Sequence, residues 1–174
     1  MRFWRIVSAL AASLPACAAL SSTDSPQDGD VPQSGYTESH NFDPALLSQF
    51  KISWKASFNQ AEFFYAKPLV YTPADAPNER VYVVSNQNIV RVLDGLNGTV
   101  LASRTLDPPF ASSDSDCGDI PNTIGIIGTP IIDPETDLMY FWSKGYLDGG
   151  AGPQGVANGS LCQPDLYLRT NSMQ

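Results

Sequence analysis

Apolar positions between residues 80 and 106 fall into three short runs separated by turn-forming residues. Residues 81–84 read Val-Tyr-Val-Val, and further β-favouring runs cover residues 89–93 and 99–106. Ser-Asn-Gln-Asn separates the first two runs, and Asp94-Gly95-Leu96-Asn97-Gly98 separates the last two. Asn97-Gly98 favours a tight hairpin, because both residue types tolerate a positive φ. The pattern therefore predicts an antiparallel meander of three strands.

The same kind of pattern extends to both sides of this meander. Further strands are predicted at residues 51–56, 67–71, 124–133, 138–143 and 165–168, because these runs alternate polar and apolar residues or are rich in β-favouring residues. Asp43 and Pro44 fit the N-cap and the first position of one or two helical turns that end near Phe50. The expected fold class is all-β, built from antiparallel four-stranded meanders.

Two parts of the chain match each other. Lys67-Pro68-Leu69-Val70-Tyr71 corresponds to Thr129-Pro130-Ile131-Ile132-Asp133, and Tyr82 in the next run corresponds to Tyr140. The offsets are 62 residues (130 − 68) and 58 residues (140 − 82), so the second copy has the shorter loop. A meander that recurs at a period of about 60 residues is typical of a β-propeller, in which each four-stranded sheet is one blade.

Two motifs resemble a known repeat. Residues 92–98, Val-Leu-Asp-Gly-Leu-Asn-Gly, resemble the A-x-D-x-x-T-G core of the PQQ-like (quinoprotein alcohol dehydrogenase-like) β-propeller repeat, with Asp94, Asn97 and Gly98 at the matching positions. Residues 125–133, which include Thr129 and Pro130, look like the start of the innermost strand of such a blade. The combination is similar to secreted fungal propeller proteins of unassigned function, over roughly residues 50–146.

The resemblance carries expectations about blade contacts and cofactors. In the full motif a tryptophan four residues after the glycine docks neighbouring blades together; that position is Ala102 here, and the strand around Trp54 resembles the end of another blade that would close the ring. Family members that are dehydrogenases hold PQQ and calcium, often beside a ring formed by adjacent cysteines. This chain has no adjacent cysteines, and none of its carboxylates matches a family calcium ligand or catalytic aspartate. The resemblance therefore assigns it no catalytic, cofactor-binding or metal-binding residue.

The length limits how much of a propeller the chain contains. Removing a signal of 18 residues leaves 156 (174 − 18), which is fewer than three blades at about 60 residues each, whereas closed propellers have at least four. We expect a signal peptide at residues 1–18, a flexible lead-in at 19–41, and two to three blades of an incomplete propeller at 42–174. The chain is thus expected to be the N-terminal part of a longer propeller.

The first 18 residues predict secretion to the extracellular space. Arg2 and Arg5 precede a short apolar run at residues 6–14, and Ala16-Cys17-Ala18 supplies small residues for cleavage. The apolar run is too short to span a membrane, so no membrane span is expected. The alternative is a bacterial lipoprotein box with Cys17 as the lipidated residue, although Pro15 fits that box poorly.

Secretion gives a role to the remaining cysteines and to two sequons. Cys117 and Cys162 are expected to form a disulfide in an oxidising compartment, and the alternative is two unpaired thiols. The pair would close a loop of 45 residues (162 − 117), which is worth about 3–4 kcal/mol on the chain-entropy model. Asn97 and Asn158 each begin an N-glycosylation sequon, although Asn97 also fits a plain turn residue.

Charge and residue types argue against several classes of function. The net charge of −8, from 10 Lys and Arg against 18 Asp and Glu, disfavours nucleic acid and anionic membrane as partners. His40 is the single histidine and no G-x-S-x-G motif is present, so the sequence offers few residues that could form a Ser-His-Asp catalytic triad. Asp114, Asp116 and Asp119 match a calcium loop only loosely and fit a solvated acidic loop better.

One aromatic cluster leaves a binding function open. Phe58, Phe63, Phe64 and Tyr65 are predicted to pack into the core beneath a loop, with a sugar or ligand platform as the alternative. The expected function is a secreted binding or structural module without a catalytic site or cofactor of its own, whose partner is an extracellular protein or a glycan. The alternatives are a part of a PQQ- and calcium-dependent quinoprotein oxidoreductase whose active-site blades are missing here, and a carbohydrate-binding β-domain.

Overall fold

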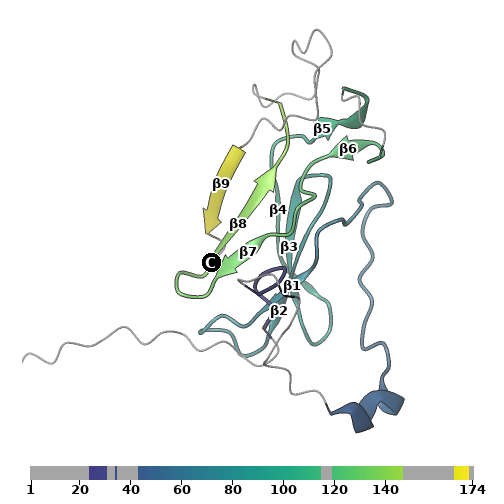
Figure 1. Ribbon diagram of the computed structural model, residues 1–174, viewed down its shortest axis with the longest axis vertical. Coiled ribbons are helices and arrows are strands. Elements are labelled where there is room, and N and C mark those ends of the chain that lie inside the picture. The colour runs from purple at the N-terminus through teal and green to yellow at the C-terminus, as the bar shows by residue number, and fades with distance from the viewer. Residues whose placement is uncertain (1–23, 31–33, 35–42, 115–118, 147–166, 173–174) are drawn as a thin grey trace, which may run out of the picture.

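The computed structural model describes residues 24–30, 34, 43–114, 119–146 and 167–172, which form antiparallel sheets with little helix (Figure 1). The predicted all-β, antiparallel class is therefore confirmed. Helical structure in these ranges consists of two 3-10 segments, η1 (Pro44–Gln49) and η2 (Ser112–Asp114). As predicted, Asp43 caps η1, and its carboxylate accepts a hydrogen bond from the Ala45 backbone N–H at 2.9 Å. No helix in these ranges is long and apolar enough to cross a membrane.

The first sheet is a four-stranded meander. β1 (Leu69–Tyr71), β2 (Arg80–Val84), β3 (Ile89–Asp94) and β4 (Val100–Thr105) pair in chain order, each antiparallel to the next. The three strands predicted between residues 80 and 106 are confirmed, and the predicted run at residues 67–71 supplies the fourth. The register shifts between Val92 and Leu93 where β3 faces β4, which marks a bulge that increases the local twist.

The second half of the chain contributes a short hairpin and a further sheet. β5 (Phe110–Ala111) pairs with β6 (Thr123–Ile124), and β7 (Ile131–Asp133), β8 (Leu138–Ser143) and β9 (Tyr167–Ser172) form a sheet in that order. The strand predicted at 138–143 is confirmed, and the last strand, predicted at 165–168, lies at 167–172. The single strand predicted over 124–133 is wrong, because only its two ends are strands. At Gly125 the backbone leaves the ladder to pass the Asn86 carbonyl, and an added Cβ would clash with that oxygen.

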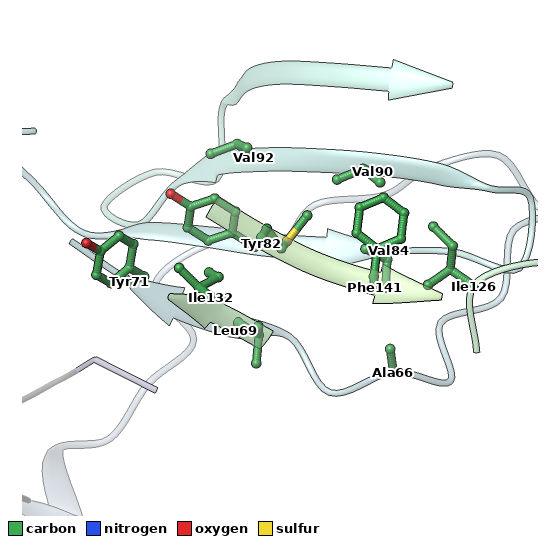
Figure 2. Packing of buried hydrophobic residues seen from close by; sticks show 11 residues of the cluster. Ala66, Leu69, Tyr71, Tyr82, Val84, Val90, Val92, Ile126, Ile132 and Phe141 are labelled. Atoms are coloured by element: carbon green, nitrogen blue, oxygen red, sulfur yellow. The ribbon is translucent and has the colours of Figure 1, made fainter. Parts of the chain in front are cut away.

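The core lies between the first sheet and the β7–β8 pair. Figure 2 shows Ile132 and Phe141 of this pair facing side chains from β1, β2 and β3. The buried cluster comprises Ala66, Leu69, Tyr71, Tyr82, Val84, Val90, Val92, Ile126, Ile132, Met139 and Phe141. Burial of a large apolar side chain contributes about 1.5–3 kcal/mol. Contact between the two sheets therefore stabilises the described part of the fold.

The two matching segments of the sequence pair in the same register. Leu69 lies opposite Tyr82 in the β1–β2 pair, and Ile131 lies opposite Tyr140 in the β7–β8 pair. These are the positions that the internal repeat places in correspondence. The hairpins are therefore equivalent units, and each strand of one has residue-by-residue counterparts in the other.

The equivalent sheets bury opposite faces. We define the A face by Leu69, Tyr82 and Val84 in the first sheet and by their counterparts Ile131, Tyr140 and Trp142 in the second. The B face is defined by Val70, Val81 and Val83 and by their counterparts Ile132, Met139 and Phe141. The core joins the A face of the first sheet to the B face of the second. Because unlike faces meet, this contact is heterologous, the kind that a further unit can repeat.

Two predictions about residues 51–65 are wrong. Residues 51–56 pair with no strand of the described chain, although burial alternates from Trp54 to Phe58, because side chains rather than a ladder hold this stretch against the first sheet. The aromatic cluster does not pack into the core: Phe63, Phe64 and Tyr65 are 38%, 42% and 44% exposed. They contact other rings instead, with centroids 5.7 Å apart for Phe58–Phe64 and 6.4 Å apart for Phe63–Tyr65.

Candidate functional site

The motif-bearing turn between β3 and β4 is held by its own side chains. The Asp94 carboxylate Oδ1 accepts hydrogen bonds from the backbone N–H groups of Leu96 and Asn97, at 2.9 and 3.1 Å. The Gly98 N–H closes the turn on the Asp94 carbonyl at 2.8 Å, with a φ of +74°. A short acidic side chain and a glycine therefore stand where this turn geometry needs them.

Trp54 docks on this turn from a distant part of the sequence. Its indole Nε1–H donates a 2.8 Å hydrogen bond to the Gly95 carbonyl. The ring covers Gly98 so closely that an added Cβ would stand 2.5 Å from Trp54 Cε3. Glycine is therefore required at position 98 both for the positive φ and for the close approach of the indole.

The stretch that follows Trp54 is fixed to the B face of the first sheet by an ion pair. Arg91, which lies opposite Val83, forms two hydrogen bonds to Glu62, of 2.6 and 2.7 Å. The Arg91 guanidinium also lies 4.3 Å from the centroid of the Phe58 ring. The side chains of Arg91 and Glu62 are only 13% and 3% exposed. The two charges neutralise each other, so the Arg91–Glu62 pair serves to hold this stretch on the sheet and acts as a structural clamp.

Two buried asparagines in the β2–β3 turn connect distant segments. Asn86 Oδ1 accepts from the Phe63 backbone N–H at 2.8 Å, and its Nδ2 donates to Thr123 Oγ1 at 3.0 Å. Asn88 Nδ2 donates to the carbonyls of Asp107 and Lys144 at 3.0 and 2.9 Å. Sequence reasoning placed these asparagines in a turn and missed their burial. The residue type signals a positive φ, which is 56° at Asn88, and gives no sign of what covers the side chain.

Two tyrosines bonded to carboxylates have raised pKa values. Burial and the hydrogen bond to Asp137 raise the pKa of Tyr71, and burial and the hydrogen bond to Asp114 raise the pKa of Tyr146. The Tyr71 hydroxyl donates to Asp137 Oδ1 and the Tyr146 hydroxyl donates to Asp114 Oδ2, both at 2.5 Å. Both phenols therefore stay protonated at neutral pH and act as hydrogen-bond donors rather than as bases.

An open cleft of about 270 Å³ lies beside the covering stretch. Its polar wall includes Glu62, Gln87 and Thr105, and its apolar wall includes Ile89 and Leu106. The Glu62 carboxylate is held by Arg91, and the Gln87 amide donates to Thr123 Oγ1 and the Ala61 carbonyl. The cleft can therefore offer apolar contact and a few hydrogen bonds, but no free carboxylate for acid–base chemistry.

The structure places the remaining predicted residues as follows. Thr129 Oγ1 accepts from the Lys67 backbone N–H at 3.1 Å, which joins the starts of the two repeats, and Pro130 is buried. Asn97 is exposed in the turn, and its Oδ1 accepts from the Thr99 N–H at 2.8 Å. Cys117, Cys162 and Asn158 lie outside the described residues, so the disulfide and the second sequon stay predictions.

The acidic loop is described only at its ends, because Asp116 lies outside the described residues. At one end, Asp114 accepts the Tyr146 hydroxyl. Among the side chains described, no group of three or more His, Cys, Asp or Glu residues is arranged to hold a metal ion. That part of the chain offers hydrogen-bonding and aromatic surfaces.

The chain was compared with protein-family models, curated proteins and solved structures. No protein-family model, no curated protein and no solved structure matches the chain.

Proposed function

We propose that this chain is a secreted binding or structural module of the PQQ-like β-propeller type, with two to three blades of an incomplete propeller. The observation that carries the proposal is the docking of Trp54 on the Gly95–Gly98 turn, through a 2.8 Å hydrogen bond and close ring contact. The resemblance implies that a tryptophan locks neighbouring blades together at such a turn. Trp54 supplies this contact from the segment that resembles the end of another blade.

The repeated register gives independent support. Equivalent hairpins that pair Leu69 with Tyr82 and Ile131 with Tyr140 stack through unlike faces. Stacking of this kind can continue around an axis, as the sheets of a propeller do. Secretion and an extracellular protein or glycan partner complete the proposal, supported by the apolar N-terminal run and the net charge of −8.

The quinoprotein alternative requires residues that can hold calcium beside PQQ. Calcium requires several oxygen ligands in one place. Within residues 43–114 and 119–146 no group of three or more His, Cys, Asp or Glu side chains is arranged to hold a metal ion. Glu62, which lines the cleft, is paired with Arg91. No catalytic step is therefore assigned to the described residues.

Glycan binding is favoured by one specific observation. Phe63, Phe64 and Tyr65 are consecutive and each more than one-third exposed, and they directly follow Glu62, which lines the cleft together with Gln87 and Thr105. Exposed aromatic rings stack on the apolar faces of sugars, and adjacent amides and hydroxyls can bond to sugar hydroxyls. A carbohydrate-binding β-domain is therefore the second candidate function.

Two assays on the purified full chain separate these functions. Addition of PQQ and calcium is expected to give no quinone-dependent alcohol oxidation, and reproducible turnover would overturn the module reading. A glycan array is expected to retain the chain if the aromatic surface binds sugar. The matched variant Phe64→Ala should lose that signal, whereas Leu47→Ala on η1, which is also exposed, should keep it. Absence of retention on every glycan leaves a protein partner as the proposal.

A further inference from the structure

The turn between β3 and β4 contains the sequon Asn97-Gly98-Thr99 and is covered only in part. The indole of Trp54 bonds to the Gly95 carbonyl and lies against Gly98. Asn97 and Thr99, the two sequon residues whose side chains take part in N-glycosylation, are both exposed. A group attached to the Asn97 side chain can therefore extend into solvent without displacing Trp54.

The Asn97 side chain uses its oxygen in the turn and keeps its nitrogen outside the turn. Oδ1 accepts a hydrogen bond from the Thr99 backbone N–H at 2.8 Å, which forms an Asx turn. Among the described residues, Nδ2 donates to no partner. An N-linked sugar is joined to this nitrogen and leaves the amide oxygen in place. The hydrogen bond to Thr99 therefore survives the modification, and so does the turn.

The turn also protects the Asn97 amide from deamidation. In an Asn-Gly pair the glycine nitrogen attacks the side-chain carbonyl carbon of the asparagine and expels ammonia. This attack requires the two atoms to be in contact and aligned. Here the Gly98 N–H donates to the Asp94 carbonyl at 2.8 Å, and the Asn97 side-chain carbonyl accepts from the Thr99 N–H at 2.8 Å. Both reacting groups are bonded elsewhere, so Asn97 keeps the amide that glycosylation requires.

The turn is formed by residues that are close in the sequence. The Asp94 carboxylate accepts the backbone N–H groups of Leu96 and Asn97, and Asn97 accepts the N–H of Thr99. These hydrogen bonds span no more than three residues, so the turn can form before the two sheets meet. The amide is therefore presented in the nascent chain as well as in the folded protein.

The surface beside Asn97 is apolar and exposed. Leu96, in the same turn, is 65% exposed, and Val100 and Leu101 at the start of β4 are 45% and 52% exposed. Exposed apolar side chains that lie together favour association between molecules. A bulky, hydrated glycan on Asn97 would stand next to these side chains and keep them apart from other molecules.

We propose that Asn97 carries an N-linked glycan in the secreted protein. The sugar donor is an oligosaccharide joined to a lipid pyrophosphate, and a transferase of the secretory pathway catalyses the transfer. Asn97 Nδ2 gives one proton to a base of that transferase and attacks the anomeric carbon of the sugar. A C–N bond forms, the C–O bond to the pyrophosphate breaks, and the lipid pyrophosphate leaves with the electron pair. The inference rests on the secretion included in the proposed function.

Mass spectrometry of the full chain exported from a eukaryotic host tests the proposal. Trypsin cleaves after Arg91 and Arg104, which isolates Asn97 as the only asparagine of residues 92–104. Peptide N-glycosidase in heavy-oxygen water then converts each glycosylated asparagine to a labelled aspartate. The wild type and Thr99→Ser, which keeps the sequon hydroxyl, are expected to carry the label in most copies. Thr99→Val is the matched variant at the same exposed position and is expected to lose the label completely.

Two forms of the chain separate this inference from the proposed secretion. One form has its own residues 1–18, and the other has an established secretory leader in their place. If only the second form is exported and its Asn97 is labelled, the proposed secretion fails and the glycan inference stands. An unlabelled Asn97 in the exported second form, or a label that persists in Thr99→Val, overturns the inference and leaves the proposed function in place.

Discussion

Tyr71 in β1 donates a 2.5 Å hydrogen bond to Asp137, which lies in the turn between β7 and β8. The two residues belong to different sheets, and the tyrosine is 3% exposed. Asp137 reaches this position with a φ of 56°, a conformation that aspartate tolerates better than most residues. The bond therefore fixes one end of the contact between the sheets, opposite the end where Asn88 donates to the Lys144 carbonyl.

Tyr71→Phe is expected to destabilise the fold by about 1–2 kcal/mol, because a hydrogen bond to a charged acceptor is lost while the apolar ring remains. Urea denaturation at neutral pH measures this difference. Thr72→Val is a suitable comparison, since Thr72 donates to Asp24 outside the contact between the sheets. A Tyr71→Phe midpoint equal to that of the wild type would show that Asp137 gains nothing from the phenol.

The same bond predicts how stability depends on alkaline pH. Burial, followed by the hydrogen bond and the charge of Asp137, raises the pKa of Tyr71 above its ordinary value of about 10. The folded state therefore binds the phenolic proton more tightly than the unfolded state. The resulting stabilisation is complete below about pH 10 and is lost as the pH rises toward the pKa of the folded state. Tyr71→Phe should flatten the alkaline decrease in unfolding free energy, and an unchanged slope contradicts this assignment.

Gly98→Ala is expected to cost about 1–3 kcal/mol and to displace Trp54. The added methyl would meet the indole at 2.5 Å, and alanine at a φ of +74° is disfavoured in its own right. Gly128→Ala is the matched control, because nothing lies within 4 Å of a Cβ there. Chemical denaturation followed by tryptophan fluorescence measures both effects. Equal stability of the two alanine variants would contradict the docking of Trp54 on this turn.

Arg91→Met is expected to destabilise the protein by about 3–5 kcal/mol, because it leaves the Glu62 carboxylate buried without its partner. The double variant Arg91→Met/Glu62→Leu should recover most of this loss, since it removes both charges from a nearly dry site. Thermal denaturation of the wild type, the two single variants and the double variant gives the coupling energy. If the double variant is the sum of the single ones, the pair is too solvated to act as a clamp.

The strands were predictable where local residue preference and burial agree. The run Val81–Val84 and the run 138–143 are rich in β-branched and aromatic residues, and turn residues flank both. Residues 51–56 show the limit of the same reasoning. Alternation reports which side chains are covered, and here Trp54 and Phe58 are covered without any ladder. Backbone pairing depends on a neighbouring strand, which the local sequence does not contain.

The candidate site was predictable only in part, for a related reason. Asp94 and Gly98 are local turn residues, so their role can be read from the motif. The indole that docks there comes from 41 residues earlier in the chain, at a position the motif did not specify. Likewise, composition alone does not distinguish buried from exposed aromatics: Phe63 is held through its backbone N–H by the buried Asn86, and its ring, like those of Phe64 and Tyr65, is more than one-third exposed.

Asn88→Asp is expected to destabilise the fold by about 2–4 kcal/mol at pH 7, because the amide of Asn88 donates to two carbonyls and a carboxylate would repel both. Burial beside these acceptors favours the protonated acid, so the pKa of the new carboxyl is raised in the folded state. Its penalty should therefore shrink as the pH falls toward 4, where the acid can donate one hydrogen bond.

Asn88→Gly keeps the positive φ without the bridge, so it should be destabilised by a smaller amount that does not vary over the same pH range. Denaturation curves of both variants at pH 4 and pH 7, each relative to the wild type, measure this difference. An Asn88→Asp penalty that is the same at both values would mean that the side chain does not bridge the ends of β4 and β8.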